Sequence, residues 1–578
     1  MKTKDYDYSM NSNKKKIFIG VAWPYVNGDI HIGHLAGYLL PADIFARFHR
    51  FRGNDVLMVS GSDCFGTPIT LEADKRGVLP QEIVEEYHEK NAALFRDLNL
   101  SFDLYTKTDT KNHRKITQDF FLRLLKGGFI FKDKTKQYYS PVNEHFLPDR
   151  YVEGKCPNCG YEAARSDQCD NCGTLIDEGT LLNPRDKITG GPVELKPSEH
   201  YFLDWRKLQP FLEKYITARG KNWRSWVLKE TKGWLKSGLK PRPITRDIDW
   251  GVEIPIEQIP EELKIKDADK KRIYVWFDAV IGYLSASIEW SKKTDRDWKE
   301  FWYDEEVEHA YFMGKDNLVF HTLFWPGQLH GYDEKIHLPD FPAVNQFLNL
   351  EGQKFSKGRG VTIDSRYIAE KYGLDAARFY LTTILPEDSD ANFGWQNFVN
   401  AVNSVLVANL GNFLNRTLTL AKGLNFKEVE VDRSVKEKTL GFIEEAKKAA
   451  EKYKFKRYAE TVLALSDFGN KYLSKEEPWF LKEKDESKFK NVLGNALYII
   501  LGLFLLLKPL LPGTYEKLEK SLGVGIDEWS GDEDKLLAEL LKRVKIQEVQ
   551  PLFKKIDESV IEIERKKIAP AQGEQGRS

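Results

Sequence analysis

The feature that most constrains the fold of this chain is a pair of histidines placed between an apolar strand and a helix. The run Ile17–Ala22 reads as a buried strand, and Leu35–Arg50 has helical periodicity. His31 and His34 lie between these two segments. A helix that begins there offers free N–H groups and the positive end of its dipole to an anion. The pattern predicts a strand–turn–helix unit with an anion site.

Strand and helix patterns alternate in two separate parts of the chain, residues 1–118 and residues 241–345. Such alternation predicts an α/β fold, in which one Rossmann-like parallel sheet is split in sequence and binds its ligand at the carboxyl ends of the strands. The expected strands are Lys16–Ala22, Asp55–Ser60, Arg272–Phe277 and Glu308–Met313, and the clearest expected helix after the first is Pro80–Leu98.

Residues 119–240 interrupt this alternation and contain four of the five cysteines. Cys156 and Cys159 form one CxxC pair, and Cys169 and Cys172 form a second pair nine residues later. Paired CxxC motifs at this spacing are typical of zinc sites, whereas the alternative of two disulfides is disfavoured in a reducing compartment. Four thiolates complete a tetrahedron, so we expect one structural Zn²⁺ in an inserted domain.

The second half of the chain begins with a connector, residues 346–393, and becomes helical from residue 394 to residue 578. The connector contains the string Lys354-Phe355-Ser356-Lys357-Gly358 within a polar, glycine-rich loop. Two lysines in such a loop can neutralise charge that develops on a polyphosphate. Each motif alone also has an ordinary interpretation, because histidines at a turn can be incidental and a lysine-rich loop can simply be solvated.

Charge and apolar runs restrict the partners. Lys and Arg together number 87, as do Asp and Glu, so the net charge is zero and neither requires nor excludes a nucleic-acid partner. The first sixteen residues lack the apolar stretch of a secretory signal. The most apolar run, Ala496–Leu507, has twelve residues, too few to span a bilayer. We therefore expect a buried helix there, no membrane partner and a cytoplasmic location.

The two motifs, with five further strings in a fixed order, resemble the methionyl-tRNA synthetase family of class I aminoacyl-tRNA synthetases. The resemblance extends over essentially the whole chain and departs from the family pattern at Gly358, where the family has a serine. The supporting strings are Ala22-Trp23-Pro24-Tyr25-Val26-Asn27-Gly28, Gly61-Ser62-Asp63-Cys64-Phe65-Gly66-Thr67-Pro68, Arg246-Asp247-Ile248-Asp249-Trp250-Gly251, Val275-Trp276-Phe277-Asp278-Ala279-Val280-Ile281-Gly282-Tyr283 and Gly314-Lys315-Asp316 with Phe320-His321.

The resemblance implies a Rossmann-like catalytic domain split by a zinc-knuckle insertion and followed by an all-helical anticodon-binding bundle, residues 394–578. It implies ATP-dependent activation of L-methionine to methionyl-adenylate, with Mg²⁺ accompanying ATP, and transfer to elongator and initiator methionine tRNA. No DNA partner is expected. A monomer is expected, because we recognise no additional dimerisation domain after the bundle.

The resemblance also implies residue roles, which fall into four groups. The catalytic group is His31, His34, Lys354 and Lys357, and ATP binding adds Asn27, Gly33 and Asp316. The substrate-binding group is Ala22, Trp23, Tyr25, Asp63, Trp276, Ala279, Tyr283, Phe320 and His321. In this group Asp63 is implied as the counter-charge for the substrate ammonium. The metal group is the four cysteines of the CxxC pairs, and the anticodon group is Asn409 and Trp479.

Two alternatives remain at this point. The first is a sister synthetase for isoleucine, valine, leucine or cysteine. The aliphatic enzymes carry a long editing insertion, whereas the insertion here has about 120 residues, and the cysteine enzyme uses zinc at its active site, whereas four cysteines leave no open position. The second alternative is a non-catalytic tRNA-binding protein, against which the intact histidines and lysines argue.

Overall fold

The computed structural model describes residues 14–568, apart from residues 168, 170, 173, 175, 178 and 357–359. Its centre is a five-stranded parallel sheet with the order β15–β14–β1–β2–β3. The strands β1, β2 and β3 from the first half of the chain are neighbours in the sheet, and β14 and β15 from the second half extend it on the other side of β1. The prediction of a split parallel sheet is therefore confirmed. The strands are β1 (Lys16–Val21), β2 (Asp55–Ser62), β3 (Leu104–Lys107), β14 (Glu308–Gly314) and β15 (Phe341–Asn345).

The central position of β1 explains its uninterrupted apolar sequence. Ile19 pairs with Met58 of β2 on one side and with Ala310 of β14 on the other. A parallel strand that is covered on both faces needs apolar residues at every position. The strand order reverses between β1 and β14, and such a switch point opens a crevice at the carboxyl ends of the strands.

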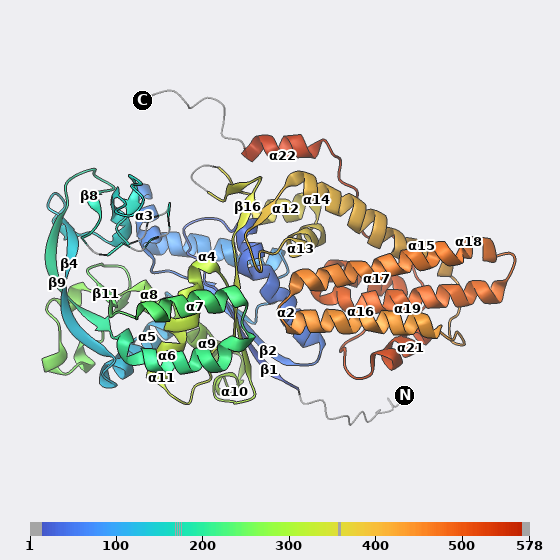
Figure 1. Cartoon of the computed structure of the whole chain (residues 1–578), viewed down its shortest axis with the longest axis horizontal. Helices are drawn as coiled ribbons and strands as arrows, with labels where there is room; N and C mark the ends of the chain where they lie inside the picture. The colour runs from blue at the N-terminus through green and yellow to red at the C-terminus, as the bar shows by residue number, and fades with distance from the viewer. Residues whose placement is uncertain are drawn as a thin grey trace.

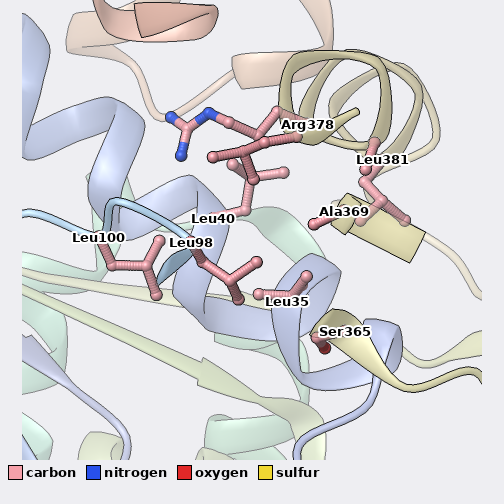
Figure 2. A pocket seen from close by; sticks show the side chains of 10 residues that line it. Leu35, Leu40, Leu98, Leu100, Ser365, Ala369, Arg378 and Leu381 are labelled. Carbon is pink, nitrogen blue, oxygen red and sulfur yellow. The ribbon is translucent and has the colours of Figure 1, made fainter. Parts of the chain in front are cut away.

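The predicted helix after the histidines is present. It runs without a break through α1 (Ile32–His34), the π-helical segment η1 (Leu35–Leu39) and α2 (Leu40–Phe51). Two connector helices, α12 (Ser365–Tyr372) and α13 (Leu374–Thr383), pack on this helix around a small apolar cavity of about 10 Å³. Figure 2 shows the leucines and alanine that meet there and the Arg378 side chain at the edge of the cavity.

One expected strand was wrong. Only Arg272–Ile273 is extended, as β13 in a small antiparallel sheet with β11 (Thr245–Arg246) and β12 (Val252–Glu253). Val275–Asp278 forms the short helix α8 instead. A short apolar run does not by itself distinguish a strand from a buried helical turn.

The insertion is built on a long antiparallel ladder between β4 (Ile130–Ser140) and β9 (Glu194–Leu203). The four cysteines lie beyond this ladder, around β6 (Val152–Lys155) and β7 (Ala164–Arg165), which pair with each other. Figure 1 shows this part at the end of the molecule opposite the helical domain. The remaining strands of these sheets are β5 (His145–Phe146), β8 (Leu182–Asp186) and β10 (Arg242–Pro243).

Two helices from the expected insertion pack on the parallel-sheet domain. The Tyr215 hydroxyl of α6 (Trp205–Arg219) donates to the Pro339 carbonyl at 2.7 Å, and Trp223, just before α7 (Ser225–Ser237), donates to the Asp340 carbonyl. We therefore propose 130–203 as the bounds of the insertion in place of 119–240. The other helices of this half are α3 (Thr67–Arg76), α4 (Pro80–Asp97), α5 (Lys111–Lys126), α9 (Gly282–Thr294), α10 (Lys299–Trp302) and α11 (Trp325–Tyr332).

The C-terminal part is a helical bundle, as predicted, with α19 (Glu486–Leu510) at its centre (Figure 1). The apolar run Ala496–Leu507 lies within α19, so the expectation of a buried helix there is confirmed. α19 has 25 residues and is, within the described residues, the one helix long and apolar enough to cross a membrane, but 94% of its apolar window is buried inside the protein. The other elements are α14 (Trp395–Asn400), η11 (Ala401–Gly411), α15 (Asn412–Ala421), α16 (Arg433–Glu451), α17 (Phe455–Glu476), α18 (Pro478–Leu481), α20 (Pro512–Leu522), α21 (Glu533–Arg543) and α22 (Val560–Ile568).

Candidate active site

A cavity of about 600 Å³ opens at the carboxyl ends of β1 and β14, where the strand order reverses. Residues from both halves of the sheet domain, from the connector and from the insertion line it. Among the residues singled out from the sequence, the lining includes Ala22, Trp23, Tyr25, His31, Gly33, His34, Asp63, Trp276, Ala279, Tyr283, Asp316, Phe320, His321 and Lys354. Asn27 lines a neighbouring cavity of about 240 Å³, and Lys357 lies outside the described residues.

The two histidines hold the start of the helix and face the cavity. His31 is the N-cap residue, and its Nδ1 accepts the Gly33 N–H at 3.1 Å. His34 Nδ1 in turn accepts the His31 N–H at 3.2 Å, which completes a reciprocal cap. A Cβ on Gly33 would lie 2.8 Å from the His31 ring, so glycine is required between the histidines. Because each Nδ1 accepts an N–H, the proton of each neutral imidazole is on Nε2.

The histidine motif and the lysine motif are in direct contact, although more than 300 residues separate them in the sequence. The Phe355 ring stacks on the His31 ring with centroids 4.6 Å apart and planes 9° apart. The chain after the lysine loop returns beside the histidines, where Ile32 N–H donates to the Ile363 carbonyl at 3.1 Å. Lys354 lines the same cavity. Histidine and lysine side chains from two distant parts of the sequence thus line one cavity.

Aromatic side chains form the other end of the cavity. The Trp23 and Tyr283 rings meet edge to face, as do those of Trp276 and Phe320. A Cβ on Gly282 would lie 2.8 Å from the Trp23 indole, so this glycine makes room for the ring. Aromatic walls of this kind suit a flexible, polarisable thioether.

A buried tyrosine–histidine pair supplies polarity within this aromatic end. The Tyr283 hydroxyl lies 2.7 Å from His321 Nε2, and His321 Nδ1 lies 2.9 Å from the Asn317 carbonyl. Because a carbonyl can only accept, Nδ1 carries the proton and Nε2 accepts from Tyr283. Burial lowers the pKa of His321 to about 4, so the imidazole is neutral at physiological pH. The Tyr283 oxygen keeps its lone pairs for a ligand.

Asp63 supplies the carboxyl group of the cavity. It follows β2, is 4% exposed, and its N–H donates to the Pro24 carbonyl at 2.9 Å. Burial raises its pKa well above the ordinary value, and the charge of Asp278 adds to the effect. A ligand that brings a positive charge would favour the ionised form. The site is therefore suited to an ammonium group.

Two arginines of the insertion were not expected from the sequence. Arg150 and Arg165 line the cavity, and the Arg150 guanidinium lies 6.0 Å from the centre of the Tyr25 ring. Isolated arginines in an insertion carry no motif, so the sequence offered no signal for them. They line the cavity together with residues of the connector.

The four cysteines fit a single zinc ion. Their sulfur atoms all lie within 4.8 Å of one another, with Cys156 and Cys172 3.8 Å apart and Cys159 and Cys169 3.7 Å apart. Four sulfurs at about 2.3 Å from one tetrahedral ion lie about 3.8 Å apart, whereas a disulfide requires about 2.05 Å. The Cys159 N–H also points at Cys156 Sγ, 3.5 Å away, as in a metal-binding turn. The set could therefore bind one Zn²⁺.

The two residues expected to contact an anticodon lie in different surroundings. Trp479 is 37% exposed on α18, with the Arg416 guanidinium 4.8 Å above its ring, so it is a surface side chain and not part of the core. The amide of Asn409 on η11 is engaged within the bundle, where it contacts Asp467, Ser466 and Asn470. Arg416 gave no signal in the sequence.

Comparison with known proteins gives consistent matches. Residues 17–418 match the model of "tRNA synthetases class I (M)", and residues 426–572 match the "Anticodon binding domain of methionyl tRNA ligase". The chain is 44% identical over 522 residues to a methionine–tRNA ligase of Roseiflexus sp. (strain RS-1), covering 88% of this chain and 87% of that one. It is 41% identical over 596 residues to that of Chloroflexus aggregans, with 95% and 98% covered.

The fold is also similar to that of a solved structure. Mycobacterium tuberculosis methionyl-tRNA synthetase, solved in complex with methionyl-adenylate, superposes with a TM-score of 0.74 at 22% identity. The match covers 93% of this chain and 99% of the other.

Proposed function

This chain belongs to the methionyl group of class I tRNA synthetases, and we propose on that basis that it activates L-methionine with ATP and transfers it to elongator and initiator methionine tRNA. The observation that carries the proposal is the single cavity that holds both motifs. His31, His34 and Lys354, which we assign to phosphate binding, line it together with Asp63 and the aromatic side chains.

Activation requires the methionine carboxylate oxygen to attack the α-phosphorus of ATP, which breaks the bond to the pyrophosphate leaving group. The reactants supply the nucleophile and the leaving group, so the protein's task is to position them and to stabilise charge. In our proposal Asp63 holds the ammonium, and the histidines with Lys354 and Lys357 hold the phosphates. We also assign Gly33 and Asp316 of this cavity, and Asn27 of the neighbouring one, to ATP binding.

Methionine selection rests on the aromatic end of the cavity. We propose that Trp23, Tyr25, Trp276 and Phe320 enclose the thioether, with the Tyr283 hydroxyl, oriented by His321, as the polar contact. Ala22 and Ala279 are small residues of the lining that leave room for an unbranched side chain. The transfer step is attack of a terminal ribose hydroxyl of tRNA on the adenylate carbonyl, with AMP as the leaving group.

The remaining proposals concern metals, location, assembly and tRNA recognition. We propose that Mg²⁺ accompanies ATP, that Zn²⁺ at the four cysteines is structural because four thiolates leave no open position, and that the enzyme acts as a cytoplasmic monomer without DNA or membrane partners. Trp479 and Asn409 are proposed to take part in anticodon recognition.

Methionine-dependent exchange of pyrophosphate into ATP tests the proposal directly. Exchange should require L-methionine and should fall by roughly 10²–10³-fold in Lys354→Ala and in Lys357→Ala, the scale for loss of one preorganised charge. Lys335→Ala, which changes an exposed lysine of the same domain, is the matched control and should exchange at the parent rate. Exchange with isoleucine, valine, leucine or cysteine in place of methionine would support a sister enzyme, and none with any amino acid would support a non-catalytic protein.

A further inference from the structure

The last helix of the described chain, α22, packs against α14 at the start of the helical part and makes side-chain contacts to the connector that carries Lys354. Figure 1 shows α22 beside α12, α14 and β16 (Leu348–Leu350). Its ion pairs and hydrogen bonds to α12 and to the turn after β16 cross more than 190 residues of sequence.

Glu564 is the centre of the first contact. This carboxylate is 2% exposed, although it lies on a short helix at the surface of the protein. Its Oε1 accepts from the Tyr367 hydroxyl at 2.6 Å, the Tyr372 hydroxyl at 2.8 Å and Lys371 Nζ at 2.5 Å, all on α12. Lys567 of α22 adds a fourth donor at 3.1 Å. A buried carboxylate with a full set of donors fixes the relative position of the two helices far more tightly than an exposed ion pair.

Arg565 makes the second contact. Its Nε lies 3.4 Å from Glu351 Oε1, and the same oxygen accepts the Trp395 N–H at 2.8 Å. Glu351 lies in the turn that joins β16 to β17 (Gln353–Lys354), with φ 46°, a left-handed conformation that a glutamate adopts only when its surroundings hold it. Lys354 ends that hairpin and enters the cavity.

The two contacts lie on opposite sides of the lysine loop. In the sequence, the turn at Glu351 precedes the loop and α12 follows it. α12 begins directly after Asp364, whose backbone forms an antiparallel β-bridge with that of His31. α22 therefore holds the chain both before and after the loop, at the point where the lysine motif meets the histidine motif.

The other end of this segment is attached to the helical domain. The Asn403 side chain of η11 donates to the Ile556 carbonyl at 2.8 Å and accepts the Ile556 N–H at 2.8 Å. Ile556 lies four residues before α22. The segment is thus fastened at one end to the helix that also carries Asn409 and at the other to the base of the lysine loop.

We propose that α22 is a clamp that positions Lys354 for methionine activation, with Glu564 as its principal positioning residue. The inference rests on the proposed function, because Lys354 must act on the phosphates for its position to matter. Since Glu564 touches neither substrate, its loss should affect turnover and ATP use and should leave the binding of methionine unchanged.

The test is pyrophosphate exchange with the full-length chain carrying Glu564→Ala, Glu564→Gln or the matched control Glu558→Ala, an exposed carboxylate six residues earlier. We expect Glu564→Ala to lower kcat by roughly 10- to 100-fold, the scale for a misplaced catalytic group, with the KM for methionine unchanged. Glu564→Gln keeps an oxygen that accepts from the tyrosines and should recover part of the rate. Glu558→Ala should match the parent.

A double-mutant cycle with Lys354→Ala separates positioning from general damage. If the clamp acts through Lys354, adding Glu564→Ala to Lys354→Ala should cause less than a 2-fold further loss. Full additivity of the two losses, or a parent-like kcat in Glu564→Ala, would overturn the clamp proposal. The proposed function is judged separately, because it stands as long as the parent chain catalyses methionine-dependent exchange. If Glu564→Ala does not fold, Tyr367→Phe with Tyr372→Phe removes two donors and keeps both rings, and the same cycle applies.

Discussion

Burial and the charge of Asp278 both raise the pKa of Asp63, the carboxyl group that we assign to the substrate ammonium. We predict that Asp63→Asn raises the KM for methionine more than 100-fold, since removing one partner of a buried charge pair costs on the order of 3 kcal/mol. The KM for ATP should change little. Exchange kinetics with each substrate varied in turn measure both values, and equal losses for the two substrates would contradict the assignment.

The raised pKa of Asp63 also predicts how methionine use depends on pH. The ammonium binds the ionised carboxylate, and a raised pKa means that the carboxyl of the free enzyme protonates at a higher pH than an ordinary aspartate. As the pH falls through that pKa, kcat/KM for methionine should fall, while that for ATP should not. The Asp63→Asn variant should lack this fall, which makes it the control in the same series of pH measurements.

For single residues, contacts between neighbours in the sequence could be predicted, whereas contacts made by packing of distant segments could not. The His31–His34 cap depends on neighbours in sequence, so the strand–helix boundary placed it correctly. The stacking of Phe355 on His31 depends on how segments more than 300 residues apart pack together. Arg150 reaches the cavity only because the insertion folds over it, which no local pattern encodes.

At the scale of elements, the cysteine cluster should be what holds the outer part of the insertion. A small core of apolar side chains includes Cys156 and Cys169 there, so metal binding and folding should be coupled. We predict one zinc per chain by elemental analysis, and loss of zinc with a lower melting temperature in Cys156→Ser. Cys64→Ser, which changes a cysteine buried in the main core, should retain the metal. A zinc-free parent protein would refute the site.

A second prediction at this scale concerns the contact between α2 and α13. Asp43 of α2 is fully buried and pairs with Arg378 of α13 at 2.8 Å and with Arg47 at 2.9 Å. Burial raises the pKa of Asp43, but these cations and the hydrogen bonds of Ser101 outweigh it and hold the pKa at about 2. The pair should therefore contribute stability that is complete above about pH 4 and is lost as the pH falls toward 2.

Arg378→Met tests this contact, because methionine fills similar space without the charge. The free energy of unfolding in urea at pH 7 should fall by on the order of 3 kcal/mol. Arg433→Ala breaks an exposed pair with Glu437 and should cost less than about 0.5 kcal/mol. Equal costs for the two variants would mean that the buried pair adds no more than a surface one.

Long elements were easier to predict than short ones for a physical reason. Helices such as α16 and α17 repeat their apolar positions over several turns, so their periodicity is unambiguous. Val275–Phe277 is too short to show a period, and its apolar residues suit a buried strand as well as a buried helical turn. The expected insertion similarly included α6, because a helix does not reveal from its own sequence which sheet it will cover.

At the scale of the whole molecule, activation belongs to the parallel-sheet domain and anticodon reading to the helical bundle, and Trp479 should affect only the second. A base stacked on an aromatic side chain is worth ~1–3 kcal/mol, so Trp479→Ala should lower kcat/KM for tRNA by roughly 5- to 150-fold. Pyrophosphate exchange without tRNA should remain at the parent rate. Aminoacylation and exchange are measured on one preparation.

Phe480 provides the matched control for that experiment. It follows Trp479 on α18 and is 58% exposed, so Phe480→Ala removes an exposed aromatic ring from the same element. Phe480→Ala should show a smaller loss with tRNA. If Trp479→Ala instead lowered exchange as much as aminoacylation, or caused a large drop in melting temperature, its role would be structural.

The position of β1 in the sheet has a consequence for synthesis on the ribosome. β1 is translated first, but its partner β14 begins about 290 residues later, with the insertion between them. At ~5–20 residues per second, one edge of this apolar strand waits roughly 15–60 s for its neighbour. An unpaired apolar edge readily pairs with other chains. The nascent protein should therefore depend on chaperones during that interval, more than the finished sheet, in which β1 is paired on both sides, would suggest.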